Sequence, residues 1–351
     1  MDFFEWSRQD LQGWLEKEGY KSYAAGQILD WIYRKKEFDF FRMTNLSLEL
    51  RKKLSKTFEL DFISLLHIEE SKTSEVTKFL WKLKDEALVE SVLIRSSDRR
   101  TVCVSSQVGC NARCAFCASG KEGFFRNLTS SEILMQIVLI DRHLNRIGES
   151  VSHVVFMGMG EPLENYDAVL SAVRKITHPQ MLQISQRRIT ISTVGVVDRI
   201  LRLAHEDLKI NLVLSLHAPN QHIRKKIIPY ARKYELQEVL NAMDHYALKT
   251  KRDVTYEYIL IDEINSEAIH AKELASLLKG KQCTVNLIPY NPVEGVKLSR
   301  PAKEKIEVFK TVLESEKIPV TWRYTKGKDI AAACGQLALK KKREVSLPIF
   351  T

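Results

Sequence analysis

From about residue 101 onwards the chain alternates short apolar segments with amphipathic ones, and this alternation limits the possible fold more than any other sequence feature. The apolar segments have the length and β-branched content of buried strands, at 151–157, 188–192, 210–217, 254–261 and 284–289. Segments with helical spacing of apolar residues separate them, for example 130–143 and 266–278. Such a βα pattern predicts an α/β fold with a parallel sheet or barrel, whose ligands bind at the carboxyl ends of the strands.

The N-terminal part of the chain has a different pattern. Ser7 and Asp10 form a predicted capping box at the start of one helix, and two more helical segments follow. Residues 61–100 alternate apolar and polar side chains as short antiparallel strands do. We therefore expect a helical accessory domain at 1–60, a β-hairpin connector at 61–100, an α/β core at 101–325 and a C-terminal loop with a basic tail at 326–351.

Composition favours a cytoplasmic protein without a membrane anchor. With 351 residues, 44% of them hydrophobic, the chain can bury a large core. Its longest nearly apolar run, 133–140, is far too short to cross a bilayer. Six unevenly spaced cysteines do not make a disulfide framework, and a reducing compartment suits thiolate ligands.

The net charge of +10 is concentrated near the C-terminus, where 14 Lys and Arg face 7 Asp and Glu from Lys281 onwards. A basic surface of this kind binds polyanions such as RNA, because each neutralised phosphate releases condensed counterions. A basic surface that only keeps the protein soluble explains the charge equally well. Charge alone leaves both interpretations open.

Three cysteines lie close together in the sequence, at positions 110, 114 and 117. A structural zinc and an electron-carrying iron–sulfur cube each take four protein ligands, so Cys110, Cys114 and Cys117 are one short. The triplet therefore indicates a cluster with one iron open for a substrate or cofactor. Buried cysteines, or a zinc knuckle completed from elsewhere, are the alternatives.

A glycine-rich turn with an acidic residue follows the predicted strand 151–157. Gly160 lets the backbone approach a ligand closely, and the carboxylate of Glu161 can accept hydrogen bonds from an ammonium group. An amino-acid-like cofactor therefore suits this turn better than a phosphate. The methionine part of S-adenosylmethionine has such an ammonium group and can chelate an open iron.

Other strand ends carry small polar groups that can bind the nucleoside part of such a cofactor. Each of them is also explained as an ordinary strand-end cap or a satisfied histidine. The residues are Ser192, Ser215, Leu216, His217 and Asn291.

Two cysteines stand alone in the sequence. Cys103 ends a predicted strand before the triplet, and Cys334 lies in an apolar stretch near the basic C-terminus. Alternatively, both are buried cysteines that only pack in the core. If they meet in space, one can act as a nucleophile and the other can resolve the adduct by forming a disulfide.

Several motifs together resemble the radical S-adenosylmethionine RNA methyltransferases of the RlmN/Cfr type. The resemblance covers about residues 86–338, and the family also has a helical module at its N-terminus. It rests on the cysteine triplet, the following segment 123–129, the turn 158–163, Ser192-Thr193, the segment 215–220 and the segment 332–337.

The resemblance implies a partial (βα)6 barrel, a [4Fe-4S] cluster held by the triplet, and S-adenosylmethionine as second cofactor. Cys334 would carry a methyl group as S-methylcysteine, Glu90 would accept the ring proton of an adenine, and Cys103 would form a transient disulfide with Cys334. Pro162 after Glu161 is similar to the branch that methylates carbon 2 of adenosine in 23S rRNA or tRNA.

The resemblance further implies an electron donor such as flavodoxin or ferredoxin, and we expect a monomer. Two alternatives stay open at this point. One is Cfr-like methylation of carbon 8 in 23S rRNA, and the other is a non-catalytic RNA-binding protein with a structural metal knuckle.

Overall fold

The computed structural model describes residues 1–322 and 326–337. Ten strands form one sheet in the order β1-β2-β3-β4-β7-β8-β9-β10-β11-β12. The first four are antiparallel, whereas β4 and β7 to β12 run parallel, which confirms the predicted α/β class. The strands are β1 Ile63–Glu70, β2 Val76–Leu83, β3 Leu88–Arg95, β4 Arg100–Cys103, β7 His153–Phe156, β8 Ile189–Thr193, β9 Asn211–Ser215, β10 Val254–Leu260, β11 Cys283–Pro289 and β12 Val320–Trp322.

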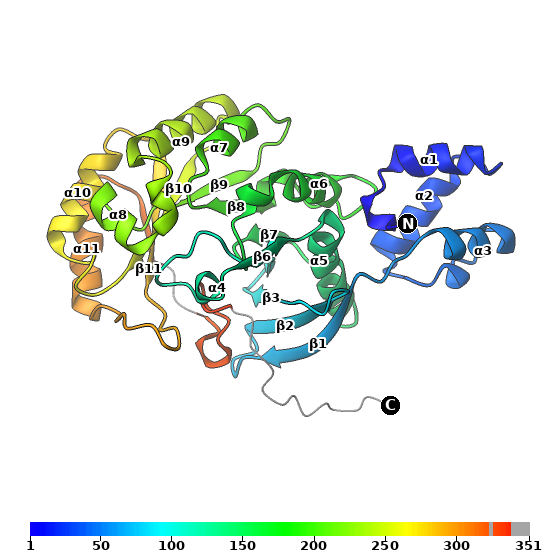
Figure 1. The fold of residues 1–351 in the computed structure, drawn as a ribbon, viewed down its shortest axis with the longest axis horizontal. Coiled ribbons are helices and arrows are strands. Elements are labelled where there is room, and N and C mark those ends of the chain that lie inside the picture. The colour runs from blue at the N-terminus through cyan, green and yellow to red at the C-terminus, as the bar shows by residue number, and fades with distance from the viewer. Residues whose placement is uncertain (323–325, 338–351) are drawn as a thin grey trace.

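Helices cross from each parallel strand to the next and cover the outside of the curved sheet (Figure 1). Parallel neighbours need such crossover connections, because a short hairpin can join only antiparallel strands. The sheet order places β12 and β1 at opposite edges, so the barrel is partial. The crossover helices are α5 Ser130–Asn145, α6 Tyr166–Thr177, α7 Val197–Leu203, α8 Gln221–Ile227, α9 Leu236–Thr250, α10 Ala268–Leu278 and α11 Lys303–Ser315.

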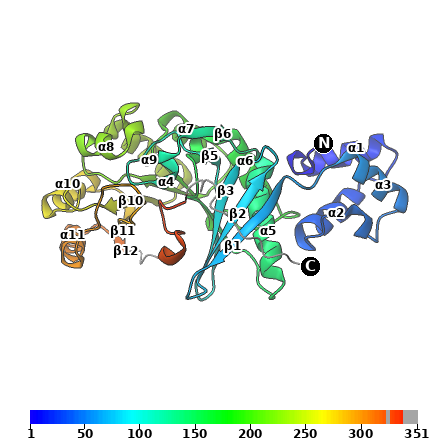
Figure 2. The ribbon, with the colours of Figure 1, turned by 60° about the horizontal axis from the view of Figure 1, so that its bottom comes forward.

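The antiparallel strands β1 to β3 continue the barrel sheet and do not form a separate layer (Figure 2). Val92 of β3 lies opposite Cys103 of β4, and Cys103 lies opposite Val155 of β7. The backbone hydrogen bonds of this ladder fix the extension to the barrel wall. Strands β3 and β4 are therefore part of the barrel wall, and every second residue on them faces the same side as Cys103.

The N-terminal helices form a compact module beside α5, away from α10 and α11 (Figures 1 and 2). The predicted capping box is present, because the amide of Asp10 donates to Ser7 Oγ at 3.1 Å and the amide of Ser7 to Asp10 Oδ2 at 2.8 Å. A buried ion pair between Lys36 and Asp141 of α5, 2.8 Å long, joins the module to the barrel. The helices are α1 Arg8–Lys17, α2 Ala24–Leu29 and α3 Leu48–Thr57.

Among the residues described, no helix is both long and apolar enough to cross a membrane. The basic residues 340–343 of the predicted tail lie outside the described residues.

Candidate active site

The loop of the cysteine triplet is fixed at both ends by backbone contacts. It follows β5 Gln107–Gly109, which pairs with β6 Phe124–Asn127. Gly109 has φ 76°, and a Cβ there would collide with the carbonyl of Gly123, so only glycine fits. The amide of Cys110 donates to that carbonyl at 2.8 Å, and the amide of Ala115 donates to Ile227 O at 2.9 Å.

The three thiols of the triplet have raised pKa values. Burial raises the pKa of Cys110 to about 12, and it also raises the pKa values of Cys114 and Cys117. Such thiols become thiolates when a metal replaces their protons. In the described part of the chain, no three His, Cys, Asp or Glu side chains converge on one ion. A [4Fe-4S] cube does not need such convergence, since each thiolate binds a different iron.

Glu161 is held rigidly in the turn after β7. Its amide donates to Gln107 Oε1 at 2.8 Å, while its carboxylate accepts from the amides of Leu163 at 3.0 Å and Val194 at 2.8 Å. Gly160 has φ 103°, and a Cβ there would lie 2.6 Å from the Gln107 side chain. Burial raises the pKa of Glu161 to about 7. An ammonium group beside this carboxylate would offset the cost of its buried charge.

The predicted nucleoside-binding residues gather at adjacent strand ends. Ser192 Oγ and Ser215 Oγ lie 3.2 Å apart. His217 has φ 58°, and its Nδ1 accepts from the Ile259 amide at 3.1 Å. Burial and the nearby charge of Arg224 lower the pKa of His217 to about 3, so its ring is neutral at physiological pH.

Asn291 and Cys334 line one cavity of about 270 Å³. Asn291 is buried, its Nδ2 donates to the carbonyl of Cys334 at 3.3 Å, and its Oδ1 has no hydrogen-bond partner among the described residues. A buried acceptor without a partner indicates a donor from a ligand, such as an adenine amino group. The same cavity is lined by Thr101 and Val155.

Cys103 and Glu90 lie on the strand face that borders this cavity. Thr101 precedes Cys103 by two residues on β4, and Val155 on β7 is the direct partner of Cys103. Thr101 and Val155 therefore lie on the same face of the sheet as Cys103. Glu90 precedes Val92, the β3 partner of Cys103, by two residues and shares that face too. The structure thus gathers the predicted base and both isolated cysteines around one region.

Comparisons with known proteins identify the family. A model of the radical SAM superfamily matches residues 104–275, and a model of the ribosomal RNA large subunit methyltransferase N-terminal domain matches residues 1–60. The "Probable dual-specificity RNA methyltransferase RlmN 2" of Protochlamydia amoebophila is 59% identical over 351 residues, which are 100% of this chain and 98% of that protein. The chain belongs to the RlmN family.

Further relatives agree with the RlmN assignment. The "Probable dual-specificity RNA methyltransferase RlmN" of Thermotoga neapolitana is 46% identical over 96% of this chain and 97% of its own length. A crystal structure of a radical SAM methyltransferase from Sphaerobacter thermophilus has a TM-score of 0.94 at 40% identity, covering 97% of this chain and 100% of that one. The chain is thus a radical S-adenosylmethionine RNA methyltransferase, which uses a [4Fe-4S] cluster and S-adenosylmethionine.

In this RlmN-family chain, the loop that carries Cys334 contacts the segment just after the cysteine triplet. The amide of Ala118, next to Cys117, donates to Gly335 O at 2.7 Å. Ser119 Oγ donates to Leu337 O at 2.6 Å. The Cys334 loop and the triplet loop therefore share backbone contacts.

The sequence did not predict a role for Arg224, which lies in α8 beside Lys225 and Lys226. The structure buries its side chain to 1% exposure. The guanidinium donates to the carbonyls of Leu216 at 3.2 Å and Ser215 at 3.3 Å, and also to the carbonyl of Val194. It therefore joins two strand ends that carry predicted ligand-binding residues. Its sequence neighbours gave no signal of this role.

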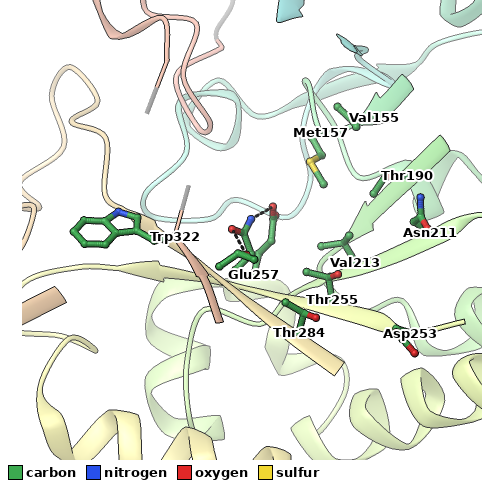
Figure 3. Close-up of a pocket in the computed structure, with 12 residues that line it drawn as sticks. Val155, Met157, Thr190, Asn211, Val213, Asp253, Thr255, Glu257, Thr284 and Trp322 are labelled. Carbon is green, nitrogen blue, oxygen red and sulfur yellow. Dashed lines mark hydrogen bonds between the residues drawn. The ribbon is translucent and has the colours of Figure 1, made fainter. Parts of the chain in front are cut away.

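A second cavity of about 500 Å³ lies inside the barrel (Figure 3). Glu257 points into it and accepts a hydrogen bond from Asn286 at 3.4 Å, while Thr321 donates to Asn286 at 3.1 Å. Glu257, Asn286 and Thr321 are direct partners in neighbouring strands and form one row across β10, β11 and β12. The polar barrel interior was not predicted. A single polar residue in an apolar strand pattern is normally expected on the solvent-exposed face of a sheet.

Proposed function

We propose that this RlmN-family enzyme methylates carbon 2 of adenosine in both 23S rRNA and tRNA. The family model for residues 1–60 is named for the ribosomal RNA large subunit, and close relatives are named as dual-specificity enzymes. Pro162 after Glu161 resembles the carbon-2 branch. The two names support both RNAs as substrates, and Pro162 favours carbon 2 over the carbon-8 alternative.

The observation that carries the mechanism is the cavity between Cys334 and the strand face of Cys103 and Glu90. Its lining includes the cations Arg99 and Lys326, which suit an RNA backbone. A methyl carrier on the wall of the cavity, with a resolving thiol and a base on the strand face beside it, has a clear use in a covalent methyl transfer.

We assign the cofactors to the barrel mouth. The cluster, when bound, supplies the electron for reductive cleavage of S-adenosylmethionine, and radical chemistry is required because adenine carbon 2 lies between two ring nitrogens and is electrophilic. The cluster ligands would be Cys110, Cys114 and Cys117. Gly160 and Glu161 would bind the methionine part, and the nucleoside part would be bound by Ser192, Ser215, Leu216, His217 and Asn291.

The protein side chains then act in sequence. Cys334 Sγ would take a methyl group from one S-adenosylmethionine, which leaves as S-adenosylhomocysteine. A hydrogen atom of that methyl group would pass to the 5′-deoxyadenosyl radical made from a second S-adenosylmethionine. The remaining carbon would join adenine carbon 2, and the adduct would give up one electron to the oxidised cluster. Glu90 takes the proton from carbon 2. The Cys103 thiolate would attack Cys334 Sγ, and the sulfur–carbon bond would break with its electron pair on the methylene carbon. That carbon would take up a proton and become the methyl group of the RNA, while Cys103 and Cys334 form a disulfide. An external thiol must reduce that disulfide before the next turnover.

The remaining parts of the proposal concern partners and organisation. The helical domain 1–60 and the C-terminal segment 326–351 would bind RNA around the core 101–325, with 61–100 as connector. A small cytoplasmic electron carrier such as flavodoxin or ferredoxin would reduce the cluster of a monomeric enzyme. The net charge of +10 is consistent with a polyanionic partner.

The test is product analysis. The anaerobically reconstituted enzyme would receive S-adenosylmethionine, a chemical reductant and either a 23S rRNA fragment or tRNA, and the digested RNA would be examined by mass spectrometry against both methyladenosine standards. We expect 2-methyladenosine from both RNAs. 8-Methyladenosine would establish the alternative, and an unmodified RNA in both reactions would overturn the proposal.

A further inference from the structure

One buried cation on the cavity side of the sheet has no place in the mechanism above. Lys78 lies in β2 with its side chain only 5% exposed. A buried ammonium group is costly unless anions and acceptors surround it. Its partners therefore indicate what it is there to hold.

Lys78 contacts two carboxylates of the antiparallel extension. Its Nζ lies 3.2 Å from Glu69 Oε2 and 3.4 Å from Glu90 Oε1. Glu69 is its direct partner on β1, and Glu90 is the diagonal neighbour on β3, so all three side chains share one face. Glu69 is 38% exposed, whereas Glu90 is as buried as Lys78. The ammonium group thus supports the negative charge of the proposed base.

The same ammonium group reaches the loop that carries Cys334. Lys78 Nζ donates to the carbonyl oxygen of Ile330 at 2.7 Å, four residues before Cys334. Gly327 and Ala331, on either side of this carbonyl, have φ 70° and 49°, so the backbone turns tightly here. One side chain therefore bonds both the proposed base and the proposed methyl-carrier loop.

We propose that Lys78 is a positioning residue of the methyl transfer. By binding Glu90 and the Ile330 carbonyl together, it holds the base as a carboxylate and seats the Cys334 loop beside it while the RNA adduct is resolved. This inference rests on the proposed roles of Glu90 and Cys334. A lysine suits the task because its ammonium group has three donors for three acceptors around it.

The test compares Lys78→Met with Lys82→Met, a matched change on the same strand at an exposed lysine paired with Glu86. We expect both variants to retain iron, S-adenosylmethionine cleavage and methylation of Cys334 within about twofold. Lys78→Met should accumulate a covalent protein–RNA adduct, with its resolution slowed by about 10²-fold, the typical effect of a lost acid–base function. Lys78→Arg should recover part of that rate.

A second readout needs no turnover. Hydrogen exchange of the amides at 330–334 should speed up by about tenfold in Lys78→Met, as expected for losing one hydrogen bond, and should not change in Lys82→Met. If Lys78→Met is recovered unfolded, the double variant Glu69→Gln/Lys78→Met, which also removes one carboxylate, takes the same tests.

Two results would overturn the inference. One is adduct resolution and loop exchange at the wild-type rates in Lys78→Met. The other is an equal loss of iron, cofactor cleavage and adduct resolution, because this would show a general structural role. A wild-type enzyme that forms neither adduct nor methyladenosine contradicts the proposed function itself, independently of Lys78.

Discussion

The triplet loop and the Cys334 loop place reactive sulfur in two different ways. The first holds three cysteines within eight residues, fixed by its own flanking strands β5 and β6. The second carries one cysteine, and its position depends on contacts with Lys78, Asn291 and Ala118 from distant parts of the chain. A local site tolerates changes elsewhere, whereas an assembled site depends on all the segments around it.

The largest expected effect is loss of the cluster when a cysteine of the triplet loop is replaced. Cys114→Ala should remove the cluster, so that iron falls from about four per chain to near zero and methyl transfer is lost. Cys283→Ala is the matched control, because Cys283 is a buried cysteine at the start of β11. Iron analysis and visible absorbance check both variants. Full iron content in Cys114→Ala would disprove the ligand assignment.

Cys334→Ala should lose methyl transfer by at least about 10⁴-fold, as expected when a covalent nucleophile is removed. It should keep its iron and its cleavage of S-adenosylmethionine, since the triplet loop is complete without this thiol. Nucleoside mass spectrometry, iron analysis and measurement of cleavage products give the three values. Methylation of carbon 2 by this variant would disprove the carrier role and erase the distinction between the loops.

The third prediction concerns the cofactor side and its pH dependence. The carboxylate of Glu161 must be ionised to bind an ammonium group, and its pKa is raised to about 7. The affinity for S-adenosylmethionine should therefore fall as the pH drops through 7 and the carboxyl group becomes protonated. Glu161→Gln should bind about 10-fold to 100-fold more weakly, with little pH dependence. Equilibrium binding across this range tests both statements, and a pH-independent wild type would contradict them.

The smallest effect concerns how the Cys334 loop is seated. In Gly327→Ala the new Cβ would lie 2.9 Å from Val76 Cγ1, and the alanine backbone would have a strained φ of 70°. We expect a loss of about 1–2 kcal/mol in loop seating and roughly 10-fold slower methyl transfer, with unchanged iron. Gly280→Ala has a similar φ of 76° but no neighbour within 4 Å, so it controls for backbone strain alone. Equal turnover in the two variants would show that the contact with β2 is unimportant.

The same contrast explains what the sequence predicted. The triplet, the capping box at Ser7 and the barrel strands follow from local spacing and periodicity, and the structure contains those helices and strands close to the expected residues. The short strand β12 was not predicted, because three residues show no period. The burial of Lys78 and Arg224 was not predicted, since their sequence neighbours do not reveal the carbonyls and carboxylates that surround them. The cavity beside the Cys103 strand face depends on strand register and on the contacts of the Cys334 loop, and neither can be predicted from local sequence.

The buried ion pair between Lys36 and Asp141 has a consequence for substrate choice. It fixes the helical module to α5, so the span from that module to the barrel mouth is a constant dimension of the enzyme. If the module binds RNA as we propose, the RNA-binding surface and the barrel mouth are a fixed distance apart. An RNA bound to the module is then a substrate when its shape brings an unpaired adenosine to the barrel mouth. Two RNAs of unrelated sequence can both meet this requirement.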